Sequence, residues 1–129
     1  MVEIISFLKV IEHGRLCDQL RGLRRRLGAA GRETAGPVAS PTLVAAAATL
    51  LADIYRLISR EPGARTLPRL DPRQAVSHHQ LAAMLADADL KLALYRDAHR
   101  DHDGETGDDW LTIEGLEALN DRRETYPRD

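Results

Sequence analysis

Apolar residues recur at helical spacing near the beginning of the chain. Leucines at positions 16, 20, 23 and 27 follow one another at intervals of four, three and four residues, which predicts a helix over residues 3–27. Ile4, Leu8 and Ile11 form a second apolar row that is out of phase with the leucine row, with Gly14 at the junction. One straight helix cannot turn both rows toward the same core. We therefore expect a kink, a break or a short leading element near Gly14, and one apolar row that is free for a partner. Because residues 2–11 are rich in β-branched side chains, a strand there is an alternative.

A second helix is predicted over residues 41–60. Ser40 is a good cap for free amide groups, and Pro41 suits the first helical position. Polar residues fall on one narrow seam of this helix and the rest of its circumference is apolar, so we expect it to be central and largely buried. Small, polar and glycine residues at 28–40 predict a flexible connection before it.

A third helix is predicted over residues 78–102, because Ser77 and Gln80 have the spacing of a capping box and an apolar row follows them. An acidic stretch with glycines at 101–109 ends this helix. A last helix over residues 110–124 precedes a frayed tail from about residue 125. The whole pattern predicts an all-α protein, one domain over residues 1–129, folded as a compact bundle of four to five helices.

Residues 77–119 allow an alternative fold. The segment 77–85 resembles the first helix of a helix-turn-helix, and residues 103–116 resemble the wing hairpin and closing helix of winged-helix regulators, with the hairpin at about 103–112. The resemblance covers about a third of the chain. It departs from the family at Ala86 and Asp87, where the turn expects glycine and then an apolar residue. One unbroken helix explains the leucine spacing equally well, and we favour it.

Composition and charge exclude several functions. The 129 residues are 43% apolar and 29% charged, with a net charge of −2, which is typical of a soluble domain and gives no overall attraction to nucleic acid. The first 66 residues carry a net charge of +4 and the remainder −6. No apolar run approaches the roughly 20 residues of a membrane span, and no signal peptide is recognisable, so we expect a cytoplasmic protein without membrane contact. The arginine, alanine and aspartate bias fits a GC-rich bacterium or its phage.

Candidate chemistry is sparse. His99 and Asp103 share a helical face and could supply two metal ligands with His102 and Asp101 nearby, but two ligands do not make a site. Cys17 has no histidine in local reach, which argues against an activated thiolate, and it is interpreted as a small core residue. We therefore expect no catalytic residue, no cofactor and no metal, and an enzyme that completes a metal site at His99 and Asp103 is only the third hypothesis.

Function follows by elimination. We expect such a chain to bind another protein as an adaptor, inhibitor or regulator, and to form a homodimer. A winged-helix regulator is the alternative, although specific DNA is not the expected target because Asp89 and Asp97 would lie on the helix that reads bases. The predicted partner-binding residues are the free apolar row and the arginines that flank the leucine row: Ile4, Leu8, Ile11, Arg21, Arg24 and Arg25.

Overall fold

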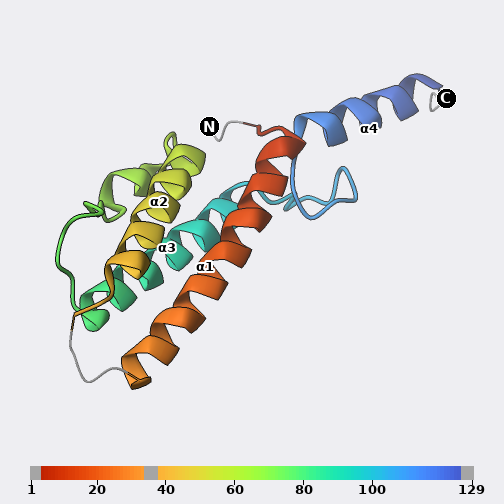
Figure 1. Cartoon of the computed structure of the whole chain (residues 1–129). Helices are drawn as coiled ribbons and strands as arrows, with labels where there is room; N and C mark the ends of the chain where they lie inside the picture. Colours follow the sequence, from red (N-terminus) through yellow and green to blue (C-terminus); the bar gives the residue numbers. More distant parts are fainter. Residues whose placement is uncertain (1–3, 34–37, 126–129) are drawn as a thin grey trace.

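The chain folds into helices without strands in the part that the computed structural model describes, residues 4–33 and 38–125 (Figure 1). Four α-helices occur in the order α1 (Phe7–Glu33), α2 (Pro41–Ile58), α3 (His78–Ala98) and α4 (Ile113–Thr125), and a short 3-10 helix, η1 (Pro62–Thr66), follows α2. α1, α2 and α3 pack side by side, with α1 antiparallel to the other two, and α4 leaves this bundle at one end. The predicted all-α helical bundle is confirmed.

The starts of α2 and α3 are set by the caps that the sequence predicts. The Ser40 hydroxyl accepts a hydrogen bond from the Leu43 amide at 3.2 Å, ahead of Pro41 in the first turn. Ser77 and Gln80 form a complete capping box, in which each side chain accepts a hydrogen bond from the backbone amide of the other. These side chains occupy amide groups that have no partner within the helix, so both starts are specified locally.

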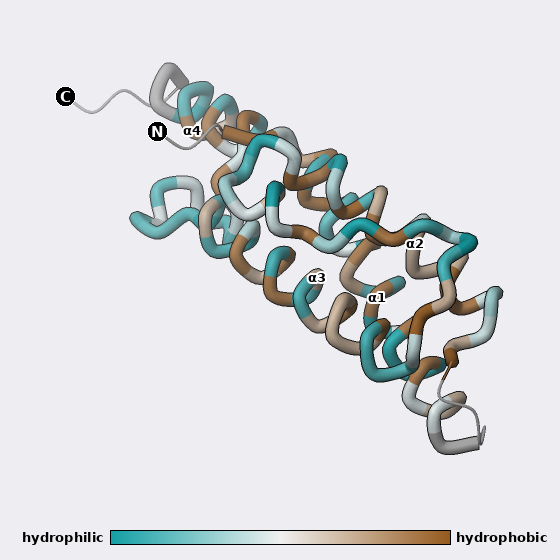
Figure 2. Tube along the Cα trace, turned by 90° about the vertical axis from the view of Figure 1, so that its left-hand side faces the viewer, coloured by the Kyte–Doolittle hydropathy of each residue, from teal (hydrophilic) through white to brown (hydrophobic). Residues whose placement is uncertain are grey.

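The core lies where the three long helices meet, and α2 contributes most to it. Eight residues of α2 are buried, from Leu43 to Ile58, and they face the leucine row of α1 and the row on α3 that begins at Leu81. In Figure 2 apolar segments recur along each helix of the bundle, whereas the loop between α3 and α4 is hydrophilic. By length and composition α2 could also cross a membrane, but a helix at the centre of a bundle meets the same description.

α1 differs from the prediction at both ends of its leucine row. It passes Gly14 without the predicted break, and it continues to Glu33 rather than ending at Leu27. Residues 28–33 are therefore helical, and the predicted connection over 28–40 is shorter than expected. Of its remaining residues, 38–40 are described and are not helical, and 34–37 lie outside the described residues, as does the predicted tail beyond 125. The alternative of a strand over 2–11 is wrong for the described residues, where Ile5 makes a single bridge to Thr112.

The winged-helix alternative is also wrong. α3 is one unbroken helix through Ala86 and Asp87, where the helix-turn-helix would need its turn. The loop after α3 resembles a hairpin in one respect, because Arg100 and Trp110 form an antiparallel bridge, with hydrogen bonds from Asp101 to Asp109 and from Leu111 to His99. A single bridge does not make a wing with two strands.

Candidate interaction surface

Exposed apolar side chains gather at the start of α1. Nine large apolar residues are exposed in the described part of the chain, and five of them lie here: Ile4, Phe7, Leu8, Ile11 and Ile113. Leu8 is 75% exposed, and Phe7 and Ile11 are each more than half exposed. We call these five residues the N-terminal patch. Apolar side chains collected in one place on a soluble protein usually mark an interaction site.

The phase of the helix explains why the patch is outside. At 100° per residue, Phe7 and Ile11 lie about 150° to 180° from the centre of the leucine row. Leu16 and Leu20, in that row, are buried to within about one percent. α1 stays continuous, so the two rows lie on different sides of the helix, and Ile4, Leu8 and Ile11 are exposed.

The start of α4 is attached to the same place. The Ile113 amide donates to the Ile5 carbonyl at 2.9 Å, and the Phe7 amide donates to the Glu114 carboxylate at 2.5 Å. A carboxylate at a helix N-terminus is stabilising, so Glu114 secures the first turn of α1. Beyond this attachment α4 extends away from the bundle, and no residue whose side chain is described in α4 belongs to the buried core.

Packing against the bundle does little to stabilise α4 in the single subunit. α4 has 13 residues, and isolated helices of about 12 to 15 residues are marginal in water. Leu116 and Leu119 are only partly covered. The surface formed by the N-terminal patch and α4 is therefore incompletely packed in the single subunit. The sequence predicted a helix here but gave no signal that it would stand off the bundle.

The predicted arginines lie elsewhere on α1. From Leu8 to Arg21 is 13 residues, or about 20 Å along the helix, so the structure does not bring the apolar row and the arginines to one point. An open hollow of about 470 Å³ is lined by Cys17, Leu20, Arg21, Arg24, Arg25 and Asp89. Arg24 is paired with Asp89 of α3 at 3.1 Å, and Arg21 lies 3.6 Å from Asp18. Both pairs are largely exposed, so they contribute little to stability.

A buried polar and aromatic cluster lies behind the patch. His13 of α1 contacts the rings of Tyr95 and Trp110, and Tyr95 contacts His99, with ring centroids between 4.5 and 5.9 Å apart. The His99 Nε2 donates to a Glu61 carboxylate oxygen at 2.5 Å, which ties the end of α3 to the segment after α2. The residues of this cluster are far apart in the sequence, and no local pattern indicated it.

His13 has a defined proton arrangement. Its Nε2 lies 2.8 Å from the Leu92 carbonyl oxygen, which can only accept, so Nε2 carries the proton and Nδ1 is the acceptor in the neutral ring. Burial lowers the pKa of His13 below its usual value, against the effect of the Leu92 hydrogen bond, and nearby Arg96 lowers it further. Neutral His13 is thus a polar member of the core.

The sequence interpretation of Cys17 needs correction. His13 lies one helical turn before it, and the Cys17 Sγ is 3.6 Å from the His13 Nδ1. The spacing of four residues was the available signal. The pair is not an activated thiolate, however, because burial raises the pKa of the Cys17 thiol, and the Asp89 and Asp18 carboxylates raise it further. The thiol instead donates to a histidine that is itself held by Leu92.

The side chains considered as metal ligands form hydrogen bonds with different partners. His99 donates to Glu61, and His102 donates through Nε2 to the Asp97 carbonyl at 2.8 Å. Asp101 accepts hydrogen bonds from the amides of Glu105 and Thr106 and from the Thr106 hydroxyl, which lower the pKa of Asp101 and shape the loop. Within the described ranges no group of three histidine, cysteine or acidic side chains is arranged to hold a metal ion.

Comparisons of this chain with protein-family models, with curated proteins and with solved structures found no match.

Proposed function

We propose that this chain is a small non-catalytic protein that acts by binding another protein through the N-terminal patch. The observation that carries this proposal is that, among the residues the structure describes, five of the nine exposed large apolar side chains lie at the junction of α1 and α4. A partner that covers Leu8 and Ile11 would remove apolar surface from water, at about 25 cal/mol for each Å² covered. The role is that of an adaptor, an inhibitor or a regulator.

The polar interior supports a binding function rather than a reaction. His13 and His99 are both buried, and each donates its Nε2 proton to a group on another element. A general base needs a reachable proton on a substrate, whereas these rings are turned toward Leu92 and Glu61. The contacts of the cluster are those that join α1, α3 and the segment after α2.

Photocrosslinking from the patch tests the proposed function. A benzophenone amino acid that replaces Phe7 is expected to give a crosslinked product in cells of the source organism, because this side chain belongs to the patch and is 53% exposed. The matched control is the same substitution at Tyr55, an exposed aromatic residue on α2. Added charge in the variant Leu8→Glu/Ile11→Glu is expected to abolish the product. A crosslinking yield that is equal from positions 7 and 55 would overturn the proposal.

Specific duplex DNA is proposed not to be the target. The helix that would read bases is packed in the bundle through Leu85, Ala88 and Leu92, and its outer face carries Asp89 and Leu90. Carboxylates on this face repel phosphate groups. In gel shifts at moderate salt, we expect no sequence-selective retention of duplex DNA. Tight and sequence-selective retention of DNA from the native locus would contradict this prediction.

A further inference from the structure

We propose that the partner on the N-terminal patch is a second copy of this chain, bound across a two-fold axis near Ile11 with the two α1 helices antiparallel. This inference rests on the proposed function, because it uses the same patch, and it adds the identity and the orientation of the partner. It is carried by the order of apolar, basic and acidic groups along one side of the molecule.

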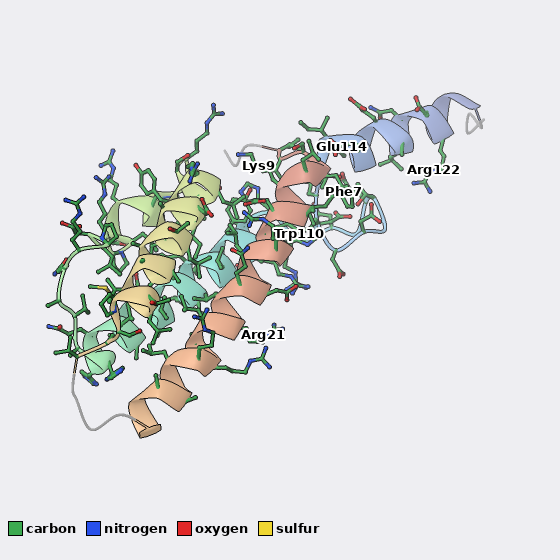
Figure 3. All side chains as sticks on the ribbon, in the orientation of Figure 1. Phe7, Lys9, Arg21, Trp110, Glu114 and Arg122 are labelled. Carbon is green, nitrogen blue, oxygen red and sulfur yellow. The ribbon has the colours of Figure 1, made fainter. Side chains whose placement is uncertain are left out.

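The outward face of α1 has an apolar half and a basic half. Phe7, Ile11 and Arg25 fall within about 40° of one another on the helix, with Arg21 beside them, on the side opposite the leucine row. Figure 3 shows Phe7 and Arg21 on the side of α1 that is away from α2. Along this face, therefore, the N-terminal patch comes first and two arginines follow, with Asp18 between them and the patch, 3.6 Å from Arg21.

An acidic segment lies at the other end of the patch. On α4 the spacing of Glu114, Glu117 and Asp121 puts three carboxylates on one face of the helix. The loop before α4 adds exposed Asp103 and Glu105. Since Glu114 bonds to the Phe7 amide, this acidic segment begins where α1 begins, and α4 extends from there on the side of α1 that carries Phe7. The order along this side is acidic, apolar and then basic.

Antiparallel pairing about Ile11 places the apolar regions of the two copies together and brings the arginines of each copy near the acidic segment of the other. Arg21 and Arg25 are 10 and 14 residues from Ile11, or about 15 and 21 Å, whereas Phe7 is only about 6 Å from it. The two arginines of one copy therefore fall about 9 to 15 Å beyond the start of α1 in the other copy, where its α4 begins. A two-fold axis makes this contact twice. Parallel pairing would instead put like charges next to each other, which is unfavourable.

Gly14 lies on this face and has open space around it in the single subunit. A Cβ added at Gly14 would meet nothing within 4 Å, although glycine inside a helix costs about 1 kcal/mol relative to alanine. Gly14 lies about 4.5 Å from Ile11 along α1 and about 60° from it around the helix, close to the proposed axis. The absence of a side chain there lets the two α1 helices approach each other near the axis.

Charge reversal tests the orientation. Two variants, Arg21→Glu/Arg25→Glu and Glu117→Lys/Asp121→Lys, each place like charges together in the antiparallel dimer, so in sedimentation equilibrium we expect each to dimerise at least about tenfold more weakly than the natural sequence. An equal mixture of the two is expected to form heterodimers, because both contacts then pair opposite charges. The matched control, Arg65→Glu/Arg73→Glu, reverses two exposed arginines away from α1 and is expected to keep the dimer.

A crosslink between copies tests the position of the axis. In a Cys17→Ser background, Ile11→Cys is expected to form a disulfide-linked dimer on mild oxidation, whereas Ala82→Cys on the exposed side of α3 is not. The two-fold dimer would be overturned by any of three results: the natural chain stays monomeric at all concentrations, the two charge-reversed variants fail to associate when mixed, or the two cysteines crosslink equally. If the chain does not dimerise but a benzophenone at position 7 crosslinks to a different protein, the proposed function still holds. If no crosslinked product forms, both the dimer and the proposed function are wrong.

Discussion

Replacing Leu16 by alanine is expected to lower the free energy of unfolding by about 2–5 kcal/mol, as is typical when a large apolar side chain is removed from a packed core. Leu16 has no exposed surface and lies in the cluster that α1 shares with α2 and α3. Urea unfolding followed by circular dichroism measures the change. The loss should be near the upper end of this range if the cavity does not collapse.

The same substitution two turns earlier on the helix gives the control. Leu8 is 75% exposed, so Leu8→Ala is expected to change the unfolding free energy of the isolated subunit by less than about 0.5 kcal/mol. The comparison should be made at a protein concentration low enough to avoid association. If Leu8→Ala and Leu16→Ala lower the free energy of unfolding equally, α1 is rotated relative to the structure described here, and the N-terminal patch is not an exposed surface.

Local signals accounted for the parts of the fold that depend on neighbours in the sequence. Ser40 and the Ser77–Gln80 pair act within three residues, so the starts of α2 and α3 could be predicted from those residues alone. The exposure of Leu8 and Ile11 followed from their phase relative to the leucine row, because phase is also a local property. These predictions needed no knowledge of the tertiary structure.

Glycine positions were misinterpreted because packing outweighed their preference. Gly14 and Gly28 suggested a break and an end to α1, but each costs only about 1 kcal/mol within a helix. The buried leucines that follow Gly14 and the packing of Ala30 against the core favour a continuous helix. Sequence alone does not give the size of that tertiary contribution.

The cluster around His13 could not be predicted because its members come from separate elements. Trp110 reaches His13 from the loop after α3, and Glu61 reaches His99 from the segment after α2. Such pairs depend on how the helices are placed. The projection of α4 from the bundle is similar, since an apolar row on a short helix predicts burial but does not identify what covers it.

The buried state of His13 predicts how stability changes with pH. Burial and Arg96 lower the pKa of His13 in the folded protein, so between that lowered value and the ordinary value of about 6.5 the unfolded chain binds more protons than the folded one. Folding stability therefore carries the full contribution of neutral His13 above pH 6.5 and loses it as the pH falls toward the folded-state pKa. Protonation would also put a donor on Nδ1, in place of the acceptor that the Cys17 thiol needs.

Unfolding curves of natural and variant chains at pH 7.5, 6.5 and 5.5 measure this contribution. The variant His13→Gln keeps an amide donor for the Leu92 carbonyl but cannot take up the proton, so its melting temperature is expected to fall less between pH 7.5 and 5.5 than that of the natural sequence. His79→Gln is the matched control, because His79 is exposed in the first turn of α3, and it should keep the natural slope. Parallel slopes for His13→Gln and the natural chain would show that His13 is hydrated in solution. The contacts among α1, α3 and Trp110 would then be looser than the ring distances imply, and the attachment of α4 beside the N-terminal patch would lose its rigid support.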